Sequence, residues 1–68
     1  MTSAELFETI RPRVRVTIVN RFGQESTGRA VMLGPAGWVL NMGRRYGTPA
    51  IVDERNLVAV GSRRASDR

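Results

Sequence analysis

Two arginine-containing stretches have residue types suited to binding an anionic polymer. The first is residues 43–49 (GRRYGTP), in which Arg44, Arg45 and Tyr46 lie between two glycines. Forked guanidinium groups can pair with phosphate oxygens, and an aromatic ring offers a face on which a base can stack. In the alternative interpretation, the ring of Tyr46 packs on the protein and the two arginines are solvated. This segment is therefore a candidate phosphate-binding loop.

The second stretch is the alternating segment of residues 13–20 (RVRVTIVN). Apolar and polar residues alternate there with the period of two that is typical of a half-buried strand. Arg13 and Arg15 would then lie on one side, about 7 Å apart given the rise of a strand. This row is either an ordinary solvated face or a stripe that follows a nucleic-acid backbone.

A third basic segment is residues 61–68 (GSRRASDR), which contains no large apolar residue to anchor it. We expect a disordered tail in which Arg63 and Arg64 add to the affinity for a polyanion.

The residue types needed for catalysis are scarce. The chain has no cysteine and no histidine, which removes disulfides, the usual zinc ligands and the commonest general base. The acidic residues show no spacing typical of a metal site or an acid–base pair, and no glycine-rich phosphate loop precedes a helix. We expect a binding protein rather than an enzyme, with no catalytic residue, metal site or cofactor.

Composition points to a small basic protein. At 68 residues the chain is one domain, near the lower size limit for a core that has no disulfide or metal. Its net charge of +5 comes from arginine alone, a bias typical of a GC-rich genome such as that of an actinobacterium or its phage. Excess positive charge favours binding to polyanions. No segment resembles a membrane span or a signal peptide, so we expect a cytoplasmic protein that does not bind membranes.

The pattern of elements is a short helix followed by strands. Residues 2–5 (TSAE) fit a capping box, and Pro12 would end the helix, so residues 1–12 form a lead-in. Strands are expected within residues 13–60, with Val31 and Leu33 able to face the core. Residues 53–56 (DERN) are too polar for core and too few for an ordinary helix, which indicates a tight turn.

The order strand, basic loop, strand, tight turn, strand over residues 37–60 resembles the second half of an SH3-like barrel. The residues that carry the resemblance are Trp38, Leu40, Gly47 and Asn56-Leu57-Val58. It implies a mainly β fold, a five-stranded barrel with a one-turn 3₁₀ segment before the last strand. The Tyr-rich strand and acidic loop with which peptide-binding SH3 domains recognise proline motifs are missing, so that activity is not implied.

Two aromatic residues each have two possible roles. Trp38 is either the largest piece of the core or the edge of a ligand groove, and we favour the core. Phe22 lies in a glycine-containing loop, where it either folds over the rim of the barrel, which we favour, or contacts a ligand.

Together these features predict a non-enzymatic module that binds the backbone of DNA or RNA. The predicted contacts are Arg13, Arg15, Arg44, Arg45, Tyr46, Arg63 and Arg64. The alternative is a protein–protein interaction module, such as a bacterial or phage adaptor that docks an acidic protein surface or self-associates as a homo-oligomer through an exposed sheet edge.

Overall fold

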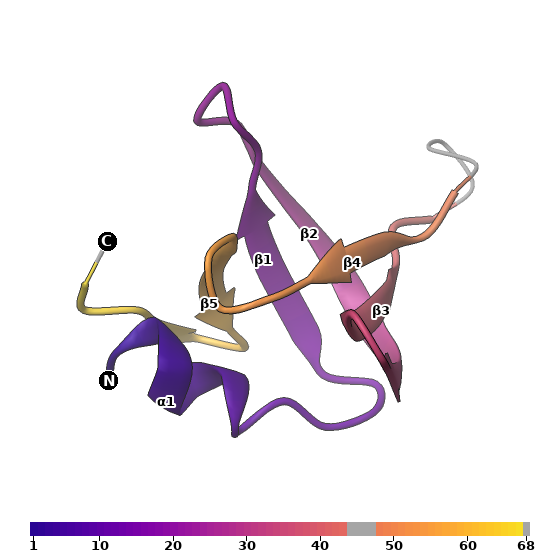
Figure 1. Cartoon of the computed structure of the whole chain (residues 1–68), viewed down its shortest axis with the longest axis horizontal. Coiled ribbons are helices and arrows are strands. Elements are labelled where there is room, and N and C mark those ends of the chain that lie inside the picture. The colour runs from indigo at the N-terminus through magenta and orange to yellow at the C-terminus, as the bar shows by residue number, and fades with distance from the viewer. Residues whose placement is uncertain (44–47, 68) are drawn as a thin grey trace.

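The protein forms one antiparallel sheet with a short helix at one end (Figure 1). The structure, a computed structural model, describes residues 1–43 and 48–67. Its elements within those residues are α1 (Ser3–Phe7), β1 (Arg15–Val19), β2 (Glu25–Gly34), β3 (Gly37–Asn41), β4 (Ala50–Val52), β5 (Leu57–Val60) and β6 (Arg63–Arg64). The strand order is β4-β3-β2-β1-β5-β6. The mainly β prediction is confirmed, whereas a closed barrel of five strands is not, because the described part is an open six-stranded sheet.

Helix α1 begins at the predicted capping box. The backbone N–H of Glu5 donates to Thr2 Oγ1 at 3.2 Å, and the backbone N–H of Thr2 donates to Glu5 Oε1 at 3.0 Å. Hydrogen bonds from the Thr2 backbone and then from its hydroxyl lower the pKa of the Glu5 carboxyl. Leu6 and Ile10 are fully buried in the same cluster as the strands. Leu6 and Ile10 thus attach the N-terminal helix and the residues after it to the core of the sheet.

The core lies on one face of the sheet and is made by alternate residues of β3, whereas all four residues of β5 are buried. Trp38 is 9% exposed and packs in the hydrophobic core, which is the role that we favoured for it. The fully buried members from the strands are Val16, Leu40, Val52 and Leu57.

The second half of β2 differs from the sequence prediction. The register between β2 and β3 shifts between Ala30 and Met32, which leaves Val31 as an extra residue in β2. A bulge of this kind breaks the alternation of the strand. Val31 and Leu33 are 51% and 58% exposed, so the expectation that they face the core is wrong. Ala30 faces the core, which points its neighbour Val31 outward, and Leu33 lies opposite Trp38 near the end of the strand.

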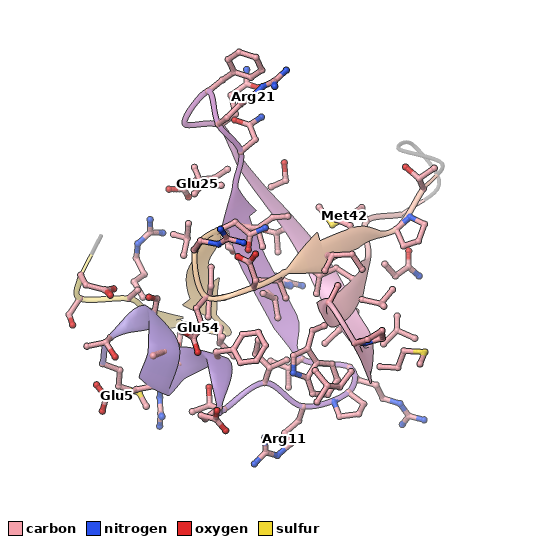
Figure 2. The ribbon with its side chains drawn as sticks, in the orientation of Figure 1. Glu5, Arg11, Arg21, Glu25, Met42 and Glu54 are labelled. Atoms are coloured by element: carbon pink, nitrogen blue, oxygen red, sulfur yellow. The ribbon has the colours of Figure 1, made fainter. Side chains whose placement is uncertain are left out.

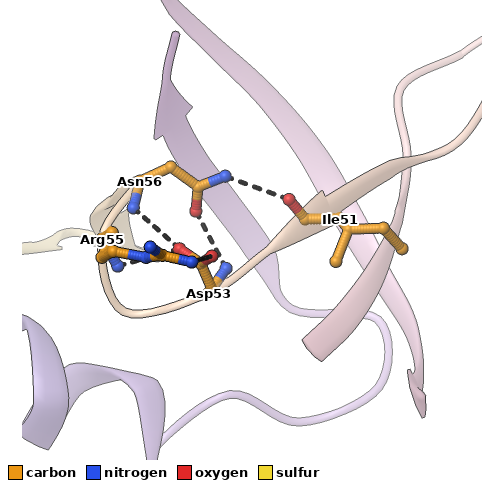
Figure 3. Close-up of polar contacts among 4 residues, drawn as sticks. All are labelled: Ile51, Asp53, Arg55 and Asn56. Carbon is orange, nitrogen blue, oxygen red and sulfur yellow. Dashed lines mark hydrogen bonds and ion pairs between the residues drawn. The ribbon is translucent and has the colours of Figure 1, made fainter. Parts of the chain in front are cut away.

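The turn between β4 and β5 is closed by side chains (Figure 3). Asp53 Oδ1 accepts from the backbone N–H groups of Arg55 and Asn56 at 2.9 and 3.1 Å. Asn56 Oδ1 accepts from the N–H of Asp53 at 2.9 Å, and its amide group donates to the carbonyl of Ile51 at 3.0 Å. The predicted tight turn is confirmed, but it is a turn and not a 3₁₀ helix.

The C-terminal residues 61–67 are ordered, so the prediction of a disordered tail is wrong for them. β6 pairs with β5, with Arg64 opposite Ala59 and Arg63 opposite Val60. The next residue, Ala65, is 8% exposed in the core cluster. Backbone pairing and one small side chain thus replace the large apolar anchor that the segment lacks.

The two ends of the described chain meet beside α1 (Figure 1). The N–H and the hydroxyl of Ser66 both donate to the carbonyl of Met1, at 2.7 and 2.8 Å. Ser3 donates to both carboxylate oxygens of Asp67 at 3.0 Å. No helix in the described ranges is long and apolar enough to cross a membrane.

Candidate functional site

The outer face of the β1–β2 hairpin carries two arginines in directly opposite positions. Arg15 of β1 pairs with Arg29 of β2, and Arg29 pairs in turn with Asn41 of β3. Opposite residues of an antiparallel pair point to the same side, with Cβ atoms about 5 Å apart. All three residues are exposed. The side chains of Arg15 and Arg29 therefore leave the sheet next to each other on its solvent-exposed side.

Nothing acidic in the described part of the chain neutralises this pair. The ion pairs found there join Arg55 to Asp53 and Arg64 to Glu25, and neither includes Arg15 or Arg29. Like charges directly opposite each other destabilise a sheet. The Arg15–Arg29 pair is therefore a local concentration of positive charge that an anion would stabilise.

A shallow depression of about 420 Å³ lies between these arginines and the end of β3. It is lined by Arg15, Thr27, Gly28, Arg29, Asn41, Met42 and Gly43. The backbone N–H of Gly43 donates to Asn41 Oδ1 at 2.9 Å, which leaves the Asn41 amide nitrogen to donate elsewhere. The depression thus combines guanidinium and amide donors around a space open to a ligand.

Gly28 allows the strands to come together at this depression. A Cβ atom at residue 28 would lie 2.8 Å from the carbonyl oxygen of Asn41 and 2.5 Å from Met42 Sδ. Any larger residue would therefore push β3 away from β2 beside the arginines.

The polar surface continues from the arginines toward the end of the hairpin. Thr17 and Thr27 are the next outward-facing pair, and their hydroxyl oxygens are 3.0 Å apart. Beyond them Glu25 forms an ion pair with Arg64 of β6, in which Glu25 Oε2 lies 3.0 Å from Arg64 Nη2. The one carboxylate that β1 and β2 contribute is therefore already paired.

An exposed aromatic residue lies at the tip of the hairpin. Phe22 is 73% exposed, and the guanidinium carbon of Arg21 lies 4.9 Å from the centre of its ring. Figure 2 shows Arg21 at the far end of the hairpin. The expectation that Phe22 folds over the rim of a barrel is wrong, because the β1–β2 hairpin projects beyond the rest of the sheet (Figure 1).

The predicted row of Arg13 and Arg15 along one strand is wrong. The N–H of Val14 donates to the carbonyl of Arg11 at 3.2 Å, which closes a turn with Pro12 and Arg13 at its corners. Arg13 has φ +75°, the left-handed region that such a turn requires at its second corner. Strand β1 begins only at Arg15, so Arg13 lies outside it.

The remaining predicted contacts have different surroundings. Arg63 is exposed on β6, and its Nη1 lies 3.9 Å from Met1 Sδ. Arg64 forms the ion pair with Glu25. The segment Arg44, Arg45 and Tyr46 lies outside the described residues, and in the sequence it follows Gly43, which lines the depression.

Sequence reasoning missed Arg29. The signal was present in the hairpin, because the loop is centred on Phe22 and residues equally far from that centre pair with each other. Arg15 and Arg29 are each seven positions from Phe22. Counting outward from the loop would have placed the two arginines side by side.

A second surface has the opposite charge. A groove of about 570 Å³ is lined by Phe7, Leu33, Gly34, Pro35, Ala36, Gly37, Asp53, Glu54 and Arg55. Partial burial by itself raises the pKa of the Asp53 carboxyl, but hydrogen bonds from the Asn56 and Arg55 backbone and the charge of Arg55 outweigh it and lower that pKa. Asp53 is thus ionised at neutral pH, and this groove is unsuited to a phosphate. Within the two described ranges no three acidic side chains come together as a metal site.

A comparison with known proteins gives no independent identification. No family model matches the chain, and no significant match is found among curated proteins or solved structures.

Proposed function

We propose that this protein is a small non-enzymatic module that binds the phosphate backbone of nucleic acid through the outer face of its β1–β2 hairpin. The observation that carries the proposal is the Arg15–Arg29 pair, exposed and without an acidic partner in the described ranges. A protein gains nothing in stability from such a pair, whereas a bound phosphate would be held by two forked guanidinium groups.

The surroundings of the pair favour backbone contacts over base recognition. Guanidinium, hydroxyl and amide groups on exposed strand positions can all donate to phosphate oxygens, and such contacts carry no sequence information. Arg44, Arg45 and Arg63 remain proposed further contacts, and their positive charge adds to the same electrostatic attraction. Either DNA or RNA would satisfy this chemistry.

We also propose that the sheet is an open variant of the SH3-like barrel. Trp38 near the start of β3, the tight turn before β5 and the position of β5 beside β1 support this assignment.

A salt titration of binding tests the proposed function. The logarithm of the binding constant should fall linearly with the logarithm of the salt concentration, because phosphate contacts release counterions. Each lost contact lowers the slope by about 0.9 for duplex DNA and about 0.7 for a single strand. The double variant Arg15→Gln, Arg29→Gln loses two contacts, so the magnitude of its slope should be smaller by about 1.8 for duplex DNA and by about 1.4 for a single strand.

The matched control is Arg55→Gln. It removes one arginine by the same substitution, but Arg55 lies in the β4–β5 turn and pairs with Asp53 at 3.4 Å. Its effect on the slope should be well below that of Arg29→Gln. Equal slopes for the wild type and the double variant would show that the hairpin is not the site.

A second candidate function, self-association, is favoured by one specific observation. Met32, Val39 and Ile51 are directly opposite one another on β2, β3 and β4, and form an apolar row on the outer face. Met32 and Ile51 are exposed. Because Asn56 occupies the carbonyl of Ile51 on the edge strand, this row would contact a second copy through its face rather than by extending the sheet.

Light scattering across salt concentrations separates the two candidates. A dimer held by the apolar row should persist at high salt and be lost on Ile51→Glu, whereas the nucleic-acid module requires no dimer.

A further inference from the structure

The exposed ring at the tip of the hairpin has no role in the core. Phe22 lies outside the cluster of packed apolar residues, and at 73% exposure it leaves most of a large aromatic surface in water. Hydration of this surface is unfavourable, so a ligand that covered the ring would gain the free energy of apolar burial.

Hydrogen bonds within the loop brace the backbone at the tip. Asn20 Oδ1 accepts from the N–H groups of Phe22 and Gln24 at 2.9 and 3.0 Å, and the carbonyl of Asn20 accepts from the N–H of Gly23 at 3.0 Å. Gly23 supplies the φ of +80° that closes the loop. A preformed loop loses little conformational freedom on binding, so it is well suited to present a side chain to a ligand.

Arg21 makes the tip a paired site for a ring and an anion. Its guanidinium lies over the Phe22 ring at 4.9 Å, a cation–π arrangement that orients both side chains. A base can stack on such an aromatic platform while an adjacent arginine attracts the phosphate joined to that base.

The tip and the Arg15–Arg29 pair lie at opposite ends of one hairpin. Asn20, at the start of the loop, is five positions after Arg15, a distance of about 17 Å at the rise of a strand. A ligand that contacts both places must therefore follow the hairpin and present an accessible base at its end. A single strand can do this, whereas a duplex keeps its bases stacked and paired inside the helix.

We propose that the nucleic acid bound at this face is single-stranded, with its backbone on the Arg15–Arg29 pair and one base stacked on Phe22. This inference rests on the proposed function and adds the class of ligand to it. Between the two contacts the strand crosses the hydroxyls of Thr17 and Thr27, and it passes Glu25, whose charge Arg64 neutralises.

The experiment compares probes that differ only in their bases. The full chain is titrated by fluorescence anisotropy, near 50 mM salt, with an oligodeoxythymidine of about 12 nucleotides, an abasic strand of the same length and a duplex of the same length. The abasic strand has the same phosphates and nothing to stack. The wild type should bind oligodeoxythymidine about 5- to 150-fold more tightly than the abasic strand, the effect of one stacked base.

Two substitutions at the tip test the role of the ring. Phe22→Leu should reduce that ratio to about one while leaving the abasic affinity unchanged, because the leucine keeps an apolar group and loses the aromatic face. Phe22→Trp should keep or raise the ratio, and its indole fluorescence should be quenched by oligodeoxythymidine and not by the abasic strand. Neither change removes a buried contact, so both variants should fold like the wild type.

The double variant Arg15→Gln, Arg29→Gln distinguishes failure of this inference from failure of the proposed function. It should weaken oligodeoxythymidine and the abasic strand by the same factor and leave their ratio intact. If this variant weakens binding but Phe22→Leu does not change the ratio, or if the duplex binds as tightly as the single strand, stacking at the tip is overturned and the backbone site stands. If no probe binds the wild type, the proposed function itself fails.

Discussion

Replacing Arg29 by glutamate should make the protein more stable and at the same time weaken its binding to nucleic acid. Arg29 lies directly opposite Arg15, and both are exposed. The substitution turns a repulsive cross-strand pair into an attractive one. Cross-strand charge pairs contribute about 0.2–1 kcal/mol, and exposure to solvent places this pair in the lower half of that range. We therefore expect the free energy of unfolding to rise by about 0.5 kcal/mol.

The gain is measurable as a shift of the thermal midpoint. For a domain of this size 1 kcal/mol corresponds to about 4–8 °C, so the expected rise in Tm is about 2–4 °C. It should be seen by circular dichroism at about 50 mM salt and shrink toward zero at 1 M salt, where charges are screened within about 3 Å. Binding of oligodeoxythymidine, measured on the same samples, should weaken.

Arg55→Glu is the control for the change in net charge. It lowers the positive charge of the protein by the same amount, but it breaks the ion pair with Asp53 and places a third carboxylate next to Asp53 and Glu54. This variant should therefore be less stable than the wild type. Opposite signs for the two variants would show that local geometry, and not net charge, decides the effect.

Two results would refute the reasoning. If Arg29→Glu is no more stable than the wild type at low salt, the two guanidinium groups do not repel each other and the pair is not a site of concentrated charge. If the variant is more stable and binds as before, the charge is real but nucleic acid binds elsewhere. Higher stability with weaker binding is the pattern expected where function opposes stability.

Three further predictions concern the fold. Gly37→Ala should leave the protein largely unfolded, because a Cβ atom there would collide with the carbonyl of Val52 at a φ of +132°. Strain and overpacking together cost roughly 2–6 kcal/mol, comparable to the whole stability of a domain this small. A urea titration should then show no cooperative transition, and a transition at the wild-type midpoint would contradict the close approach. Arg13→Gly should raise the thermal midpoint relative to Arg13→Ala, because only glycine adopts the left-handed φ of +75° without a penalty; equal midpoints would contradict the turn. Asp53→Asn should reduce the amount of stability that the protein loses as the pH falls into the acid range. The pKa of Asp53 is lowered by folding, so its contribution is present above the ordinary aspartate value of about 3.9 and is lost as pH falls below it. Thermal midpoints between neutral pH and about pH 2 would check this, and an unchanged acid limb in the variant would count against it.

Features that depend on neighbouring residues could be predicted from the sequence. The capping box of Thr2 and Glu5, and the alternation of β1, involve residues a few positions apart, so local chemistry is sufficient. The bulge after Ala30 could not be predicted in the same way, because it reflects how β2 and β3 align over their whole length. Val31 and Leu33, which were expected to face the core, are exposed on either side of this shift.

Of the Arg15–Arg29 pair, only Arg15 could be predicted from the sequence, because the pairing depends on residues that are far apart in the chain. Arg15 stands out in an alternating segment, but its importance depends on Arg29, fourteen residues later, and becomes visible only once the hairpin loop is fixed at Phe22. The order of residues 61–67 depends on contacts with Met1 and Ser3 at the other end of the chain. Composition alone, which is polar and basic there, favours disorder.

The contacts between the two ends of the described chain couple the first and last elements of the fold. Met1 accepts two hydrogen bonds from Ser66, and Ser3 donates two to Asp67. Opening of β6 from the edge of the sheet would therefore break the contacts that hold the start of α1, and fraying of α1 would release β6. Amide hydrogens of both segments should exchange with solvent at similar rates, as one cooperative unit separate from β1 and β2. We therefore expect the helix and the edge strand to open together. Their opening would also release Glu25 from Arg64, while the pairing of β1 with β2 that places Arg15 beside Arg29 would remain.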